Sequence, residues 1–100
     1  MQDLRNRFLP RFVQSGRERV RRALEACAGD VRLDVVATEL HALAGEAVLL
    51  ELREIVSLAR AAESTARSPS PGAEAACETA LRDIRTALNA LGAGGPSGRP

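Results

Sequence analysis

Apolar side chains recur at helical spacing along most of this chain. The clearest run covers about residues 33–50, where they follow one another at intervals of three and four: Leu33, Val36, Leu40, Leu43, Ala47 and Leu50. Similar stripes predict helices over about residues 52–66 and 73–91. The N-terminal region up to Cys27 has the same spacing in two halves, which predicts a helix interrupted near Pro10 and weakened near Gly16.

Short breaks separate these helical segments. In the turn "AGD", Gly29 is expected to stop the first helix and Asp30 to cap the next. A very short connection is expected within residues 50–54, and a loop around Pro69 and Pro71. We therefore expect an all-α fold, an up-and-down four-helix bundle with or without a short extra N-terminal helix. The bundle would occupy residues 1–91, with residues 92–100 as a flexible tail or linker.

Composition narrows the class of protein. With 45% apolar but only 2% aromatic residues, the core must come from aliphatic helix faces. A net charge of +1 gives no basis for a nucleic-acid or membrane surface. Cys27 and Cys77 are too few for a disulfide framework and are expected to be buried free thiols. No apolar run reaches the roughly 20 residues of a membrane span. We expect a cytoplasmic protein. We also expect a monomer, since one bundle uses all the visible apolar stripes.

The only histidine, His41, lies roughly 120° from the centre of its apolar stripe, so it is expected on an exposed flank. Small or aliphatic residues are expected around it: Ala37, Ala44, Gly45 and Val48. A glycine inside a helix costs about 1 kcal/mol, and close approach of another surface is the usual reason for one. These residues predict a low patch on which a large partner can dock. Close packing between helices is the alternative explanation for Gly45.

Glu63 occupies an inward position of its helix, where an apolar residue is expected. If the turn lies near Glu51, His41 and Glu63 stand at heights of roughly 15 and 18 Å on antiparallel neighbours, so they can meet. A carboxylate that accepts the Nδ1 proton would leave Nε2 as an exposed nucleophile. Arg60 is a candidate contact for a phosphoryl group. Alternatively, His41 has no function, and Glu63 pairs with Arg60 or Arg67 on its own helix.

The run from His41 to Gly45 reads H-A-L-A-G, followed by an apolar stretch and then Glu63. It resembles the motif H-x-L-K-G of the histidine-phosphotransfer (Hpt) family, including the N-terminal phosphotransfer domains of chemotaxis-type histidine kinases. The resemblance implies that His41 is phosphorylated, that Gly45 leaves room for a receiver domain, and that Glu63 is the hydrogen-bond partner of the imidazole. Two positions depart from it: Ala44 replaces the motif lysine, and Glu51 stands where a glycine often closes the helix.

The resemblance implies a phosphorelay intermediate, which carries a phosphoryl group on His41 between a kinase or receiver domain and the aspartate of a response-regulator receiver. No segment resembles an ATP-binding or kinase motif, and one histidine makes a poor metal site, so no cofactor of its own is expected. The partner receiver would supply Mg²⁺. The first alternative is a degenerate docking module that binds a receiver or kinase without phosphotransfer, as the loss of the lysine at Ala44 would favour. The second is a structural bundle with no signalling role.

Overall fold

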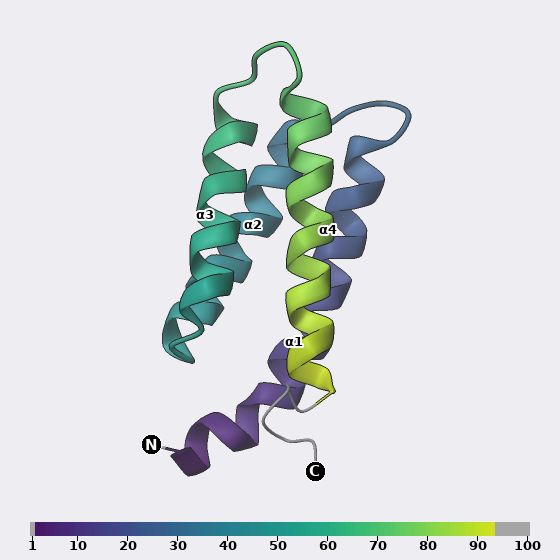
Figure 1. Cartoon of the computed structure of the whole chain (residues 1–100). Helices are drawn as coiled ribbons and strands as arrows, with labels where there is room; N and C mark the ends of the chain where they lie inside the picture. The colour runs from purple at the N-terminus through teal and green to yellow at the C-terminus, as the bar shows by residue number, and fades with distance from the viewer. Residues whose placement is uncertain (1, 94–100) are drawn as a thin grey trace.

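The computed structural model describes residues 2–93, with side chains described from residue 6 onward. It contains four helices, α1 (Gln2–Cys27), α2 (Leu33–Leu49), α3 (Arg53–Arg67) and α4 (Ala73–Gly92). They run alternately up and down, and each packs against its neighbours in sequence (Figure 1). Since α4 also returns to α1, the four helices close into one ring. The predicted up-and-down bundle is confirmed. Of the expected tail, residues 94–100 lie outside the described residues.

The predicted interruption of the first helix is wrong. α1 continues through Pro10 as one helix of 26 residues, so no separate N-terminal helix exists within residues 2–27. Pro10 has no N–H to donate to the carbonyl of Asn6. Figure 1 shows the N-terminal part of α1 turning away from the bundle axis. A proline tolerated inside a helix commonly causes such a bend.

Gly16 is buried where α1 meets α2 and α4. A Cβ at this position would lie only 3.1 Å from both terminal methyl carbons of Leu88 on α4 and 3.2 Å from Leu43 Cδ1 on α2. The glycine thus has a packing role, which allows the backbone of α1 to approach two neighbours closely. The weakening predicted at Gly16 reflects the low helix propensity of glycine, and α1 nevertheless continues through this residue.

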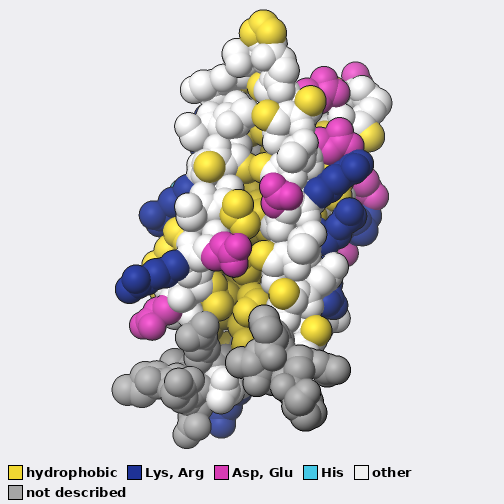
Figure 2. Space-filling model, viewed as in Figure 1, with side chains coloured by type: hydrophobic (Ala, Val, Ile, Leu, Met, Phe, Trp, Pro, Cys, Tyr) yellow, Lys and Arg dark blue, Asp and Glu magenta, His cyan; other side chains and the backbone are white. Residues whose placement is uncertain are grey.

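Aliphatic side chains fill the core, as the composition predicts. The largest fully buried ones are Leu40, Leu43, Leu81, Ile84, Leu88, Val20 and Val36. Apolar side chains show through along the seam between α3 and α4 (Figure 2). Cys27 and Cys77 are buried free thiols, as expected, and burial raises the pKa of both.

In the α1–α2 connection, the residue at the N-cap of α2 differs from the predicted one. Gly29 has a left-handed φ of +61° just after the end of α1, in agreement with its expected role as a helix stop. However, α2 begins at Leu33 with Arg32 as its N-cap, and no side-chain hydrogen bond caps it. Asp30 lies too early in the chain for the N-cap position. The expected cap is therefore wrong.

The α2–α3 connection is as short as expected and forms a Schellman motif. The N–H of Leu52 donates to the carbonyl of Ala47 at 3.0 Å, and that of Glu51 donates to Val48 at 3.0 Å. Glu51 takes a left-handed φ of +58°, a conformation that favours glycine. This tight turn holds α2 and α3 antiparallel and side by side.

The arginine-rich run "RERVRR" on α1 does more than face solvent. Arg19 pairs with Glu39 and Glu46 of α2, each at 3.2 Å, and Arg22 pairs with Glu39 at 3.0 Å. Only Arg21 pairs wholly within α1. Arg19 and Arg22 therefore join α1 to α2.

Candidate functional site

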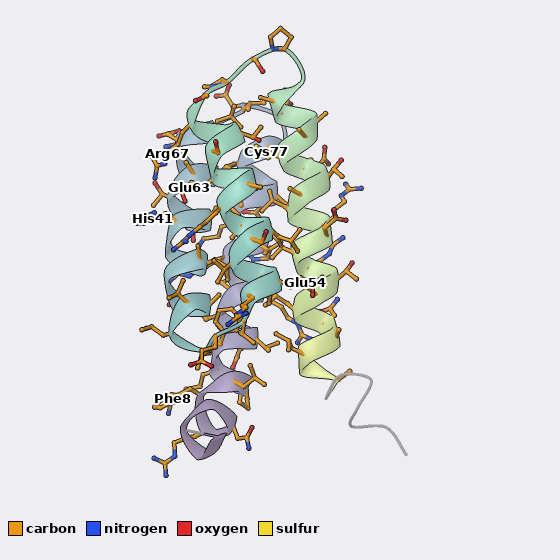
Figure 3. The ribbon with its side chains drawn as sticks, turned by 60° about the vertical axis from the view of Figure 1, so that its left-hand side comes forward. Phe8, His41, Glu54, Glu63, Arg67 and Cys77 are labelled. Carbon is orange, nitrogen blue, oxygen red and sulfur yellow. The ribbon has the colours of Figure 1, made fainter. Side chains whose placement is uncertain are left out.

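The antiparallel pair α2 and α3 brings His41 and Glu63 together. His41 Nδ1 lies 3.1 Å from Glu63 Oε2, within hydrogen-bond distance. The imidazole is 74% exposed, whereas the carboxylate side chain is only 15% exposed in the groove between the helices. Figure 3 shows the two side chains facing one another on the same edge of the bundle. The contact that the sequence predicts from their heights is therefore present.

A second donor shares the same carboxylate oxygen. Arg67 Nε donates to Glu63 Oε2 at 2.8 Å, from one turn farther along α3 (Figure 3). The Arg67 guanidinium, and then the hydrogen bond from His41, hold the pKa of the Glu63 carboxyl below its ordinary value, against the opposing effect of burial. Glu63 is consequently ionised at neutral pH.

The ionised carboxylate determines the tautomer of His41. A carboxylate can only accept hydrogen bonds, so the proton of the neutral imidazole must lie on Nδ1. Nε2 then carries the free lone pair. Because the ring is largely exposed, that lone pair is accessible to a partner molecule. The arrangement provides an oriented nitrogen nucleophile on an otherwise ordinary helix surface.

The structure distinguishes two arginines of α3. Arg60 is exposed and forms no ion pair with any residue in 6–93, so nothing here joins it to the imidazole. Arg67 instead contacts the partner of His41. Sequence reasoning treats Arg67 only as an alternative partner for Glu63 and misses it as a site residue. Its i+4 spacing from Glu63 makes it a candidate in the sequence, but Arg60 at i−3 is a candidate on the same ground.

Only two of the four residues of the predicted docking patch are exposed. Gly45 and Val48 are exposed, but Ala37 and Ala44 are only 2% and 3% exposed and belong to the core. The reason is that α2 packs against both α1 and α3, so its buried face extends beyond the leucine stripe. Ala37 and Ala44 lie on the flank between that stripe and His41, and the neighbouring helices cover them.

Gly45 has no role in helix packing. A Cβ built on it would meet no atom within 4 Å, and its φ is not positive. The alternative explanation, in which this glycine lets two helices approach, therefore applies to Gly16 and not to Gly45. Beside His41, Gly45 instead leaves an open, low stretch of helix surface.

An apolar groove of about 510 Å³ lies farther along α2, between its last turn and the first part of α1. It is lined by Phe8, Arg11, Phe12, Ser15, Glu46, Leu49 and Leu50. Leu49 is 82% exposed, and Phe8 and Val48 are exposed as well. Since Val48 follows Gly45 along the same face of α2, exposed apolar surface extends from beside His41 to the groove.

Comparison with known proteins agrees with this geometry. The family model of the Hpt domain matches residues 7–94, which include all four helices' packed portions and the histidine. No curated protein and no solved structure matches the chain. None of the helices within residues 2–93 is long and apolar enough to cross a membrane. Hpt domains are phosphotransfer-relay modules of two-component signalling and interact with kinases and receiver domains. With its four-helix bundle and exposed histidine, the chain belongs to the Hpt domain family.

Proposed function

We propose that His41 is the phosphoacceptor of this domain and that Nε2 is the attacking atom. The observation that carries the proposal is the hydrogen bond between His41 Nδ1 and the ionised Glu63. It assigns the proton to Nδ1 and leaves the lone pair of Nε2 on a ring that is 74% exposed.

In the transfer step, Nε2 attacks the phosphorus of an acyl phosphate on the aspartate of a receiver domain. The Nε2–P bond forms as the P–O bond to the aspartate breaks, and the aspartate leaves as a carboxylate. The proton on Nδ1 stays in place, so positive charge develops on the imidazole. Glu63 stabilises that charge. The reverse step passes the phosphoryl group to another receiver, and a kinase can supply it instead.

The domain contributes little beyond position and charge to this step. Mg²⁺ on the partner receiver would neutralise the phosphoryl oxygens. Both partners act on ATP-derived phosphoryl groups, so the proposal places the domain in the cytoplasm. It also takes the domain as a monomer, because the four helices close one bundle that uses their apolar stripes.

The docking surface we propose for the receiver starts at Gly45 and continues along Val48 and Leu49 to Phe8 at the apolar groove. Exposed apolar area next to the nucleophile supplies binding free energy. The open space at Gly45 allows the partner to approach the imidazole closely. Ala37 and Ala44, which the sequence placed on this surface, are replaced in the proposal by Leu49 and Phe8.

One observation favours a second function, a docking module without transfer. Ala44 takes the place of the motif lysine and is buried, so it offers no cation to a phosphoryl group. Arg60 remains a candidate for that contact from α3, since its exposed side chain is free to move. If neither Arg60 nor another cation compensates, the domain would bind receivers and leave them phosphorylated.

The test is phosphoryl transfer from a panel of phosphorylated receiver domains and kinases, with the wild type beside His41→Gln. We expect label on the wild type alone, stable in base and lost in acid, as for a phosphohistidine. Arg60→Gln then measures the contribution of that side chain. Receiver binding without label would support the docking module. Label that persists on His41→Gln would refute the proposal.

A further inference from the structure

Two donors converge on a single oxygen of Glu63. His41 Nδ1 approaches Oε2 from α2 at 3.1 Å, and Arg67 Nε approaches it from the same helix as Glu63 at 2.8 Å. A glutamate side chain has three rotatable bonds, so its carboxylate needs a second anchor to remain directed at one partner. The contact from the guanidinium is the shorter of the two, and both of its partners are charged.

We infer that Arg67 is a positioning residue: by holding the Glu63 carboxylate against His41 it keeps the imidazole in the Nδ1–H tautomer. The inference rests on the proposed function, in which Nε2 of His41 is the nucleophile. An imidazole in water favours the opposite tautomer, with the proton on Nε2, and in that form Nε2 has no lone pair with which to attack. Arg67 thus acts on the reaction through Glu63, without touching the phosphoryl group.

The surroundings make Arg67 the residue suited to this role. On α3, Arg60 is the other cation within one turn of Glu63, and it forms no ion pair with residues 6–93. On α2, Glu39, Glu46 and Asp34 are the acidic residues nearest in sequence to His41, and Glu39 pairs with Arg19 and Arg22 of α1. Glu46 pairs with Arg19 of α1, and Asp34 is exposed near the start of the helix. Among the described residues, only Arg67 forms an ion pair with Glu63 besides the contact from His41 itself.

If Arg67 had a purely structural role, its removal would have the same effect as removal of any similar ion pair on the helix surface. An ion pair between residues four apart on a helix contributes little to folding when its arginine is largely exposed, as Arg67 is. The same helix pair occurs on α4, where Arg82 Nη2 donates to Glu78 Oε2 at 2.8 Å, also in the order Glu then Arg. Arg82→Gln therefore removes an equivalent pair that does not involve His41, and it serves as the matched control.

The experiment is ¹⁵N NMR of the neutral imidazole in the full chain, recorded at alkaline pH. His41 is the only histidine, so its two nitrogen shifts are unambiguous and report the share of each tautomer. We expect the wild type to be mainly Nδ1–H. Arg67→Gln and Glu63→Gln should both move the ring toward Nε2–H. Arg67→Lys, which keeps a donor, should restore part of the wild-type share, and Arg82→Gln should match the wild type.

A second readout links the tautomer to chemistry. Phosphorylation of His41 by phosphoramidate, a small donor that needs no protein partner, should slow by roughly twofold to fivefold in Arg67→Gln, in step with the loss of the Nδ1–H share. Thermal unfolding of Arg67→Gln and Arg82→Gln should be alike, which separates positioning from stability.

Three results would overturn the inference. The tautomer ratio could be unchanged in Arg67→Gln but altered in Glu63→Gln, which would leave Glu63 as the sole determinant. The Nδ1–H share could instead rise in Arg67→Gln, which would mean that the arginine competes with His41 for the carboxylate. Arg82→Gln could also shift the ratio as much as Arg67→Gln. If the tautomers behave as expected but the wild type accepts no phosphoryl group, the proposed function fails while the role of Arg67 stands.

Discussion

Gly16 and Gly45 both lie inside helices and lead to opposite predictions, and Gly45→Ala is the sharper test. Gly45 lies within α2 with a φ that is not positive, so alanine can adopt the same backbone conformation. A Cβ there would meet nothing within 4 Å. The substitution therefore changes helix propensity and the outer surface beside His41, and leaves the packing of the bundle unaltered.

The magnitude follows from these two facts. Alanine is more favourable than glycine inside a helix by about 0.5–1 kcal/mol, partly because it restricts the unfolded chain. With no clash to offset the gain, the free energy of unfolding of Gly45→Ala should exceed that of the wild type by about that amount. For a domain of this size, the melting temperature should rise by roughly 2–8 °C.

The assay is urea unfolding followed by circular dichroism, with transfer from a phosphorylated receiver measured on the same variant. Gly16→Ala is the control, because its Cβ would lie 3.1–3.2 Å from Leu88 and Leu43. Overpacking should cancel the propensity gain there, so Gly16→Ala should be less stable than Gly45→Ala by about 1 kcal/mol or more. Transfer should slow in Gly45→Ala, and more so in Gly45→Gln, whose side chain obstructs a docking receiver.

Destabilisation by Gly45→Ala would refute the reasoning, because it would mean that the glycine is needed by the fold. A more stable protein with unchanged transfer in both Gly45→Ala and Gly45→Gln would confirm the energetics but reject docking over this residue. The expected combination, greater stability with slower transfer, would show that the chain gives up folding free energy at Gly45 for access to His41.

Three other substitutions test the turn, the carboxylate and the groove. Glu51→Gly should raise the free energy of unfolding by about 0.5–1 kcal/mol, since glycine relieves the left-handed φ; an unchanged urea midpoint would contradict this. The pKa of Glu63 is lowered in the folded state, so its stabilisation is present above its ordinary pKa near 4.5 and is lost as the pH falls through the lower folded value. Glu63→Gln should thus cost about 0.5–1 kcal/mol at pH 7 and progressively less in acid; a difference that stays constant from pH 7 down to about pH 3 would count against the ion pair. Leu49→Ser should alter stability by less than about 0.5 kcal/mol, because the side chain is 82% exposed, yet weaken receiver binding about fivefold by calorimetry; equal affinity would exclude the groove.

Local chain properties made much of this protein predictable. Helix periodicity placed the second, third and fourth helices to within one or two residues, since a 3.6-residue repeat of apolar side chains is a strong signal. The pairing of His41 with Glu63 could also be predicted, because a short turn between antiparallel helices relates height on one to height on the other. Propensity alone was misleading at Pro10, because α1 continues through the proline as one helix.

The sequence therefore predicted the helices, their order and the level at which Glu63 meets His41, because each depends on spacing along one or two helices. Which small residues are exposed required the assembled bundle. Ala37 and Gly45 look alike on a single helix, and only the packing of α1 and α3 around α2 buries the first and leaves the second open. The choice of Arg67 over Arg60 as the partner of Glu63 likewise depended on side-chain placement in three dimensions. Burial and side-chain pairing are properties of several helices together, and no periodicity in one segment encodes them.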